Sequence, residues 1–309
     1  PLNETGAFNT SVLIDRSSKE GGTGISDNMI AIGTNGMLYN TELNVTFDYK
    51  QGALKIDPTS TTLVTKASKQ TSKTVSVDSS PAMYQNYVYY ADLQGVLHCV
   101  DTTTMTTQWA VKTGDAVKAS VSLDFDDNGT LWVYTANTLS NRAKGACQIR
   151  RYNAMTGEEG WTAEIPVKKV NKSDVVPGAM ASAVIGQESL GDLVIYALSN
   201  VTTDTGYVTA DQDGLIVALN KSTGAVEWTY ATTSYLYSSP VAVYTADGEA
   251  RIIQCAADGT ILMLDASGSL VNSLQVTGTI EASPAVYQNT LVIGTTGKDT
   301  SFIYGIALQ

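Results

Sequence analysis

Residue types that commonly carry catalysis are scarce in this sequence. Among 309 residues there is one histidine, His98, so a Ser-His-Asp triad or a Cys-His pair would have to use it. His98 precedes Cys99 in a strand-like run, where adjacent side chains point to opposite faces, so the two cannot form a nucleophile–base pair. No HExxH, GxSxG or P-loop motif occurs. We therefore predict that His98 is structural and that the chain has no catalytic residue.

Long hydrophobic runs and basic residues are also lacking. No apolar run approaches the roughly 18 residues of a membrane-spanning helix, which excludes a membrane span. Lysine and arginine number 19 against 30 acidic residues, and the net charge of −11 excludes nucleic acid as the main partner. The three cysteines, Cys99, Cys147 and Cys255, show neither a CxxC motif nor zinc-ligand spacing, and each lies in an apolar run. We predict three buried, unpaired thiols.

The remaining composition is typical of a folded protein outside the cytoplasm. Hydrophobic residues make up 43% of the chain, enough for a sizeable core. Threonine, serine, asparagine and tyrosine are abundant, and the sequence begins at Pro1 rather than at a methionine. We expect a bacterial protein that is extracellular or displayed at the cell surface, compatible with a lipid anchor before processing. The oligomeric state is left open.

Internal repeats dominate the rest of the sequence. Serine and proline followed by small apolar residues and tyrosine begin a motif at Ser80, Ser239 and Ser283, with weaker copies at Ser120 and Ser182. Two runs rich in β-branched residues and tyrosine follow each copy, separated by Gly, Asn or Asp, which is typical of strands joined by hairpins. In three copies a tryptophan lies eight residues after the Asp or Asn that ends the second run: Trp109, Trp161 and Trp228.

Each repeat therefore predicts four short strands. A four-stranded sheet of about 40 residues cannot bury both faces alone, whereas radial stacking of such sheets covers them. We predict an all-β fold, a single β-propeller domain over residues 1–309 with four-stranded antiparallel blades. Six blades are expected, with seven as the alternative because residues 29–33 fit the repeat less cleanly. The expected blades cover residues 30–78, 79–118, 119–178, 179–237, 238–281 and 282–309.

The two ends of the expected propeller need separate arguments. Residues 45–57 match residues 88–101 around a shared Gln-Gly, which predicts the middle strands of the first blade, with residues 61–67 as its outer strand. The last repeat ends at its third strand. We expect residues 10–16 to supply the fourth strand and to close the ring, because closure removes an open sheet edge.

The stretches Leu215–Trp228 and Tyr152–Trp161 resemble the repeat of the quinoprotein-like (PQQ-repeat) β-propeller superfamily, and the resemblance covers most of residues 30–309. It implies that a glycine in each repeat permits a tight turn and that the repeat tryptophans pack between blades. A quinone-dependent dehydrogenase of this superfamily would also carry adjacent cysteines beside the quinone, and a calcium held by Glu, Asn and Asp. No two cysteines are adjacent here. The resemblance is therefore to the non-catalytic scaffold members, without PQQ or another cofactor.

One segment has the spacing of a calcium-binding loop. Asp124, Asp126 and Asn128 precede Gly129 in the D-x-D-x-N-G alternation that points successive oxygens at one cation. The later acidic ligand of such loops is missing. A plain hairpin turn, in which Asn-Gly supplies positive φ, explains the same letters. Calcium at this segment and a simple turn are both kept as interpretations.

Loop length selects a candidate binding surface. In a propeller, the loops between the second and third strands emerge on the same face as the loops between blades. The long insertions, residues 137–146, 200–213, 69–78 and 166–181, all fall in these two classes. Long loops on a rigid scaffold commonly carry binding residues. The candidate partner-binding residues are Tyr207, Tyr235, Tyr237, Arg142, Lys144, Lys168 and Lys169.

Charge favours the same face. The short turns of the opposite, acidic face hold twelve acidic residues against one lysine, Lys221. An acidic face can serve solubility alone; alternatively, the long-loop face stays near neutral because it docks a partner. The leading hypothesis is a non-catalytic scaffold that binds a protein, peptide or glycan. The alternative is a propeller enzyme, an oxidoreductase, lyase or hydrolase, with a site in the central channel.

Overall fold

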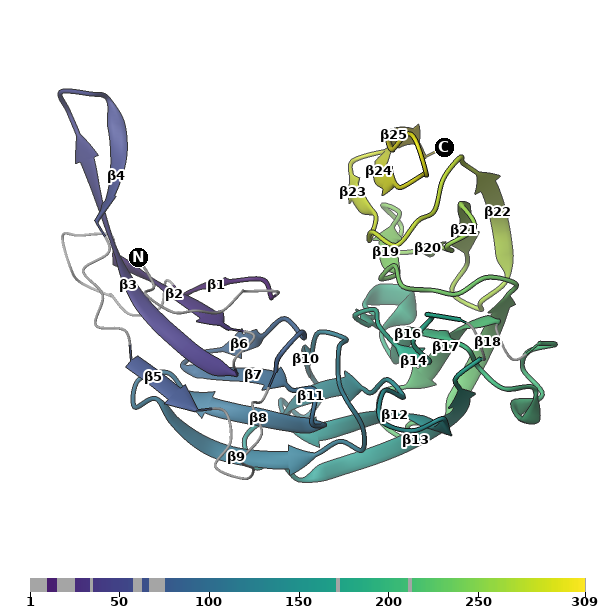
Figure 1. Cartoon of the computed structure of the whole chain (residues 1–309). Helices are drawn as coiled ribbons and strands as arrows, with labels where there is room; N and C mark the ends of the chain where they lie inside the picture. The colour runs from purple at the N-terminus through teal and green to yellow at the C-terminus, as the bar shows by residue number, and fades with distance from the viewer. Residues whose placement is uncertain are drawn as a thin grey trace. The chain divides into compact units, whose positions relative to one another are not determined.

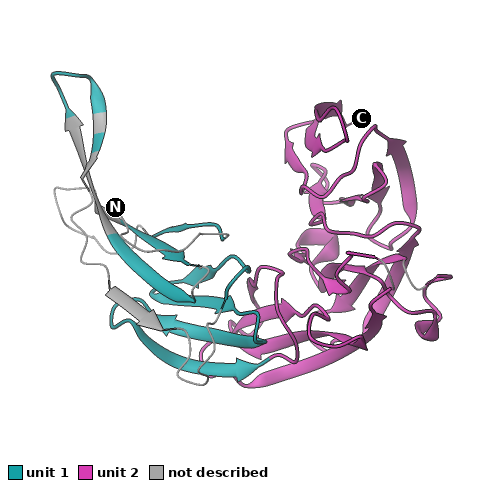
Figure 2. Ribbon diagram, in the orientation of Figure 1, with its two compact units in different colours: residues 1–112 teal, residues 113–309 magenta. Residues whose placement is uncertain are grey.

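A computed structural model of the chain describes residues 10–15, 26–33, 36–57, 63–66, 76–170, 173–210 and 213–308. Strands joined by turns make up these residues, together with two three-residue 3-10 turns, Glu188–Leu190 and Thr203–Thr205. The expected all-β class is confirmed. The chain divides into two compact units, residues 1–112 and residues 113–309 (Figure 2).

The described residues of 113–309 form four antiparallel sheets, numbered third to sixth here, whose strands pair in sequence order, except that the first two strands of the fourth sheet both pair with its third strand (Figure 1). The third sheet contains β10 (Ser122–Phe125), β11 (Leu131–Ala136), β12 (Lys144–Asn153) and β13 (Glu159–Lys168). The fourth contains β14 (Gly178–Ala179), β15 (Val184–Ile185), β16 (Leu193–Ser199), β17 (Gly214–Asn220) and β18 (Val226–Thr232). The fifth contains β19 (Val241–Tyr244), β20 (Ala250–Cys255), β21 (Thr260–Leu264) and β22 (Leu270–Gln275). The sixth contains β23 (Ala285–Tyr287), β24 (Thr290–Thr295) and β25 (Phe302–Ala307).

The core of this unit lies between neighbouring sheets. β16 and β17 are buried along almost their whole length, so both faces of the fourth sheet are covered. One apolar cluster joins the third and fourth sheets and includes Tyr134 and Tyr196. Further clusters join the fourth sheet to the fifth and the fifth sheet to the sixth. This placement is what the stacking of propeller blades requires.

Two of the repeat tryptophans connect one sheet to the next. Trp161 in β13 donates from its indole Nε1 to the carbonyl of Lys221, 2.7 Å away, in the turn between β17 and β18. Gly224 in that turn has φ 74°, and a Cβ there would lie 2.7 Å from the Trp161 ring. Trp228 repeats this contact on Gly268 of the fifth sheet, where a Cβ would lie 2.4 Å from its ring. The repeat tryptophan of one sheet therefore packs its indole ring against the glycine-containing turn of the next sheet.

The repeat serines form a second set of connections. The backbone N–H of Ser182 donates to Oγ of Ser239 at 3.0 Å, and the N–H of Ser239 donates to Oγ of Ser283 at 2.9 Å. Within residues 1–112, the N–H of Ser11 donates to Oγ of Ser80 at 3.0 Å. Ser11 thus occupies the place of a repeat serine in the first sheet.

Residues 1–112 form two sheets. The first contains β1 (Leu13–Asp15), β2 (Ser26–Ile32), β3 (Met37–Asp48), β4 (Ala53–Asp57) and β5 (Leu63–Lys66). The second contains β6 (Ala82–Tyr84), β7 (Tyr87–Ala91), β8 (Val96–Asp101) and β9 (Thr106–Lys112). Trp109 in β9 packs beside Tyr89, with ring centroids 5.9 Å apart. The described residues therefore hold six sheets in all, consistent with six blades.

The first sheet corrects two expectations. Of residues 10–16, which were expected to complete the last blade, the structure describes 10–15, and there Leu13 in β1 pairs with Ile30 in β2, which makes β1 the first strand of the first sheet instead. Residues 45–57 are not the middle strands either. β2 and β3 take that place, and Ile30, Ile32 and Leu38 on them are fully buried. Residues 29–33 therefore start no seventh sheet within the described residues.

The segment 45–57 instead forms a hairpin that runs out from the first sheet (Figure 1). The end of β3 pairs with β4, and the turn between them carries Gly52 with φ 61°. The part of β3 nearer its start pairs with β5, which is the outer strand that residues 61–67 predict. The Gln-Gly match indicated the place where the chain reverses, and that reversal is confirmed.

Candidate functional site

The loops of the long-loop face contact one another within the second unit. This name refers to the described residues of the segments 113–121, 137–143, 169–177, 200–213 and 233–240, which leaves out 171, 172, 211 and 212. The N–H of Thr138 donates to the carbonyl of Ala116, and the N–H of Leu139 donates to the carbonyl of Pro177, each at 2.8 Å. Two of the loops, those expected over residues 137–146 and 166–181, are shorter than expected, because β12 begins at residue 144 and β13 extends to residue 168. Of the expected loop 69–78, only residues 76–78 lie among the described residues.

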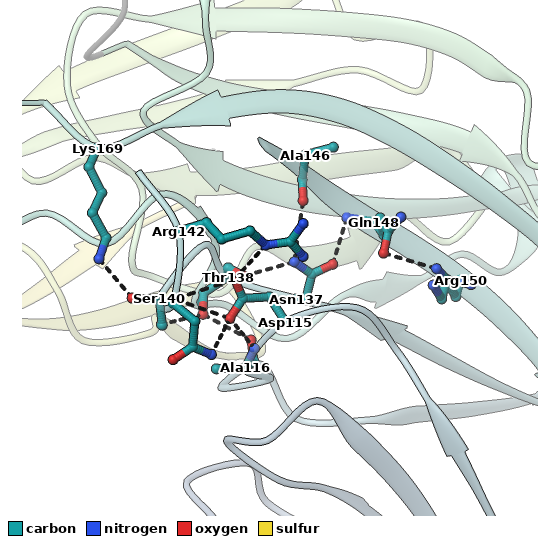
Figure 3. Close-up of polar contacts among 11 residues, drawn as sticks. Asp115, Ala116, Asn137, Thr138, Ser140, Arg142, Ala146, Gln148, Arg150 and Lys169 are labelled. Atoms are coloured by element: carbon teal, nitrogen blue, oxygen red, sulfur yellow. Dashed lines mark hydrogen bonds and ion pairs between the residues drawn. The ribbon is translucent and has the colours of Figure 1, made fainter. Parts of the chain in front are cut away.

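Buried polar groups hold loop 137–143 in place (Figure 3). Asp115 is 3% exposed, and its Oδ1 accepts the side-chain amide of Asn141 at 2.6 Å. Asn137 is 1% exposed, and its Oδ1 accepts the N–H of Gln148 in β12 at 2.7 Å. A loop fixed by satisfied, buried hydrogen bonds presents its outer side chains without a large cost in conformational entropy. Sequence analysis missed Asp115 and Asn137. The sequence feature that could have indicated them is a polar residue directly beside a long loop.

Two of the expected cations project from this loop and its strand. The side chains of Arg142 and Lys144 are 62% and 69% exposed. Nε of Arg142 lies 3.8 Å from the Asp115 carboxylate. Lys144 Nζ donates to Oδ2 of Asp204, 3.2 Å away in loop 200–213, and that carboxylate is also exposed. Acidic residues of the same face therefore orient both cationic side chains, which remain exposed to solvent.

The other two expected cations connect loops. Lys169 Nζ donates to the carbonyl of Ser140 at 2.7 Å, which ties loop 169–177 to loop 137–143 (Figure 3). The backbone N–H of Lys168 donates to the carbonyl of Asn200 at 3.1 Å. Asn200 has φ 53°, and its side-chain amide donates to the carbonyl of Val175 at 3.0 Å. Lys169 therefore joins two loops through its ammonium group, whereas Lys168 joins strand and loop through its backbone.

The expected aromatic residues differ in their openness. Tyr235 and Tyr237 are half-buried and lie edge to face, with ring centroids 4.8 Å apart. Burial, together with the Glu281 carboxylate that accepts its O–H, raises the pKa of Tyr235 to about 12. Burial also raises the pKa of Tyr237, whose Oη accepts the N–H of Val176. Tyr207 is 40% exposed and is the most open of the three.

Arginines from the strands neutralise part of the acidic face. Lys221 Nζ donates to Oδ2 of Asp124 at 2.6 Å, and Arg151 lies 3.5 Å from Oδ2 of Asp126. Sequence analysis counted only the charges in the turns, so it did not include the arginines of this face, which lie in the strands β12 and β20. Two further strand arginines pair with acids of this face: Arg150 with Glu159 and Arg251 with Glu249.

The calcium candidate has the geometry of a hairpin turn. Oδ1 of Asp126 accepts the N–H of Asn128 at 3.0 Å, and its Oδ2 accepts the indole N–H of Trp132 at 2.8 Å. These bonds, that of Trp132 first, hold the pKa of Asp126 below its usual value. The carboxylate of Asp124 already accepts a hydrogen bond from Nζ of Lys221. Among the described residues, no group of three His, Cys, Asp or Glu could hold a metal ion. The side chains present therefore fit the turn better than a cation site.

His98 has a buried acidic partner that sequence analysis missed. Its Nε2 lies 2.9 Å from Oδ2 of Asp92, and both side chains are 0% exposed. Tyr90 stacks on the imidazole, with ring centroids 4.9 Å apart. Asp92 and His98 flank the turn between β7 and β8, a spacing of six residues that could have indicated the contact. The pair is sealed from solvent and braces this hairpin.

Four-stranded sheets joined by tryptophans on glycine turns, with the long loops in contact with one another, define a β-propeller of the PQQ-repeat class. The family described as outer membrane protein assembly factor BamB matches residues 145–303, more than half of the chain. The chain belongs to this family. Among the described residues, no helix has the length and apolar character needed to cross a membrane.

Solved structures share the fold. BamB from Moraxella catarrhalis superposes with a TM-score of 0.54 at 18% identity, covering 87% of this chain and 64% of that one. A europium-containing methanol dehydrogenase gives a TM-score of 0.56 at 12% identity, covering 87% of this chain and 54% of that one.

One similar protein sequence covers a smaller part of the chain. A β-alanine-activating enzyme from Danio rerio is 29% identical over 101 residues, 31% of this chain and 9% of that protein. The chain thus spans less than two thirds of each relative.

Proposed function

We propose that this chain is a non-catalytic scaffold that binds a protein partner through its long-loop face. The network beneath loop 137–143 carries the proposal: Asp115 and Asn137 are buried, satisfied polar groups that hold Arg142 and Lys144 outward. Solubility alone requires no fixed loop. A preorganised surface, by contrast, lowers the ordering cost of association.

The chemistry of the face favours a polypeptide with acidic side chains. Arg142, Lys144 and Tyr207 are exposed on neighbouring loops, and arginine and tyrosine are enriched at protein interfaces. The loops in contact belong to more than one sheet, which suits an extended protein surface better than a short peptide or a glycan. The family's description as an outer membrane assembly factor supports a bacterial protein of the periplasm or the outer membrane that works with protein partners.

The donor set supports a non-catalytic role over the enzyme alternative. The His98–Asp92 pair has no exposed surface. The cysteines are free and buried at three separate places, so they offer no adjacent pair to a quinone. Together with the hydrogen-bonded Asp126 and the Lys221-bound Asp124, the residues present do not fit a quinone with its calcium.

A crosslinking experiment in the bacterial envelope tests the proposal. A photoreactive amino acid replaces Arg142, Lys144 or Tyr207 on the long-loop face, or the exposed Asp127 or Glu158 on the acidic face as matched controls. We expect a discrete crosslinked protein from the first set and none from the second. Crosslinks from the acidic-face positions alone would overturn the assignment of the face.

A further inference from the structure

Two tyrosines of the long-loop face lie side by side in the loop between β18 and β19. Tyr235 and Tyr237 are half-buried, and their ring centroids are 4.8 Å apart with an interplanar angle of 63°. Leu236 between them is 0% exposed. Its N–H donates to Oγ of Ser199 at 3.0 Å, and that hydroxyl donates to its carbonyl at 3.1 Å. The anchoring of Leu236 in the core therefore keeps both rings together at the surface.

Neighbouring loops fix the position of the two tyrosines. The N–H of Val176, in the loop between β13 and β14, donates to Oη of Tyr237. The N–H of Ala257, in the turn between β20 and β21, donates to the carbonyl of Tyr235 at 3.1 Å. Because the pair is held from two sides, a ligand that binds it needs to order few side chains, which favours affinity.

The surroundings of the pair are negatively charged. The O–H of Tyr235 donates to Oε1 of Glu281, 2.8 Å away in the loop between β22 and β23. A phenol that donates to a carboxylate gains electron density in its ring. Burial raises the pKa of Tyr237, and the carboxylates of Glu281 and Asp174 contribute to the rise.

The carboxylates beside the pair lack a cationic partner among the described residues. Asp174 and Glu281 are both exposed. The ion pairs among the described residues of the second unit engage other acids, namely Asp115, Asp124, Asp126, Glu159, Asp204 and Glu249. An aromatic pair beside such carboxylates attracts a cation, because the face of an aromatic ring is negative.

We propose that Tyr235, Tyr237 and Glu281 bind an arginine side chain of the protein partner. This assignment rests on the scaffold function proposed above. A guanidinium group is planar, so it can stack on a tyrosine ring and direct its fork of N–H donors at a carboxylate. The ammonium of lysine is a compact, strongly hydrated charge without this planar fit. The site therefore selects arginine over lysine.

The arginine site gives the long-loop face two regions of opposite preference. Arg142 and Lys144 favour acidic side chains, whereas the tyrosine pair with Glu281 favours a basic one. A partner segment with both kinds of side chain can match both regions in one orientation only, because the reverse orientation brings like charges together. The face therefore selects the direction of the segment as well as its composition.

The first test uses the full chain and Nα-acetylarginine amide as the probe. An NMR titration should shift the backbone amide signals of Tyr235, Tyr237 and Glu281 in a saturable way. Nα-acetylcitrulline amide has the same shape without the charge and should bind at least about tenfold more weakly, and Nα-acetyllysine amide about threefold more weakly. No saturable shift, equal binding of the citrulline derivative, or tighter binding of the lysine derivative would overturn the proposal.

Two pairs of variants locate the site. Glu281→Gln keeps the size of an exposed side chain, removes its charge and should weaken binding of the arginine probe at least about fivefold, whereas Glu158→Gln on the acidic face is the matched control. Tyr237→Leu removes one ring and should also weaken binding, and Tyr287→Leu, at a 78% exposed position on β23, is its control. Loss of binding in the controls, or unchanged binding by Glu281→Gln, would contradict the site.

The outcomes separate this site from the function on which it rests. Crosslinks from Arg142 and Lys144 without arginine binding would overturn the arginine site and leave the scaffold function standing. Arginine binding without any crosslinked protein would support the site and contradict the scaffold function.

Discussion

Replacing Gly224 with alanine should destabilise the second unit by two separable effects. Gly224 has φ 74°, and that left-handed conformation costs an L-residue about 1–2 kcal/mol. A Cβ at this position would also lie 2.7 Å from the Trp161 ring, so the ring or the turn must move. Gly129→Ala is a matched control with the backbone cost alone, because Gly129 has φ 77° and no heavy atom within 4 Å of the added Cβ.

A double-mutant cycle with Trp161→Ala isolates the collision. Trp161 is 8% exposed, and its truncation should cost about 3–5 kcal/mol, the usual range for a large core side chain. In that background Gly224→Ala meets no ring and should cost only the backbone term. The sum of the single costs should therefore exceed the cost of the double variant by about 1–3 kcal/mol, the cost of overpacking.

Urea unfolding followed by far-UV circular dichroism measures each free energy. We expect Gly224→Ala to lower the midpoint more than Gly129→Ala, with similar slopes for both. Equal losses in these two variants, or single costs that add to within about 0.5 kcal/mol, would refute the contact between ring and turn.

Three further predictions concern buried and charged groups. Burial raises the pKa of the thiols of Cys99, Cys147 and Cys255 to about 12, so iodoacetamide at about pH 8 should modify none of them in the native protein and all three in urea; rapid native labelling would contradict their burial. Added PQQ with calcium should leave the melting temperature unchanged, and a clear rise would favour the enzyme alternative, because a ligand specific for the native state stabilises it. The lowered pKa of Asp126 means that its contribution to stability is complete above the unfolded value of about 3.9 and is lost as the pH falls through the folded value. Asp126→Asn should therefore flatten the acid side of a plot of urea midpoint against pH, and an unchanged acid side would show that Asp126 contributes nothing.

Local signals predicted most of the second unit. Runs of β-branched residues bounded by Gly and Asn locate strands because hairpin turns need positive φ, and the run of residues 214–220 is β17 in full. The burial of all three cysteines followed from their apolar neighbours and is confirmed. The role of Trp161 and Trp228 between sheets was implied by the resemblance to the PQQ-repeat superfamily, and the period of the repeat places both at the same point of successive sheets.

The first sheet shows where local signals fail. A turn signal such as Gln51-Gly52 states where the chain reverses, and it does not state which strands become neighbours. Ser11 takes the place of a repeat serine in the first sheet, as its contact with Ser80 shows, but neither the proline nor the tyrosine of the motif follows it in the sequence. Pairing in this sheet is decided by burial of Ile30 and Leu38, which depends on the sheet as a whole.

Contacts at the candidate site were equally invisible in the sequence. Arg151, which pairs with Asp126, lies in β12, and the register between β11 and β12 decides which acidic residue it can reach. The bond between Asp115 and Asn141 joins residues of two different loops. Loop length alone could indicate the face, whereas the fixed conformation of its loops emerges from these long-range bonds.

The affinity of the crosslinked partner for two sets of charge reversals tests the scaffold account most directly. One variant carries Arg142→Glu and Lys144→Glu on the long-loop face, and the matched control carries Asp127→Lys and Glu158→Lys at exposed positions of the acidic face. By biolayer interferometry, the first variant should bind at least about tenfold more weakly, with a reduced dependence on salt, and the control should bind within about twofold of the unmodified chain. Normal binding by the first variant together with loss of binding by the control would contradict the account.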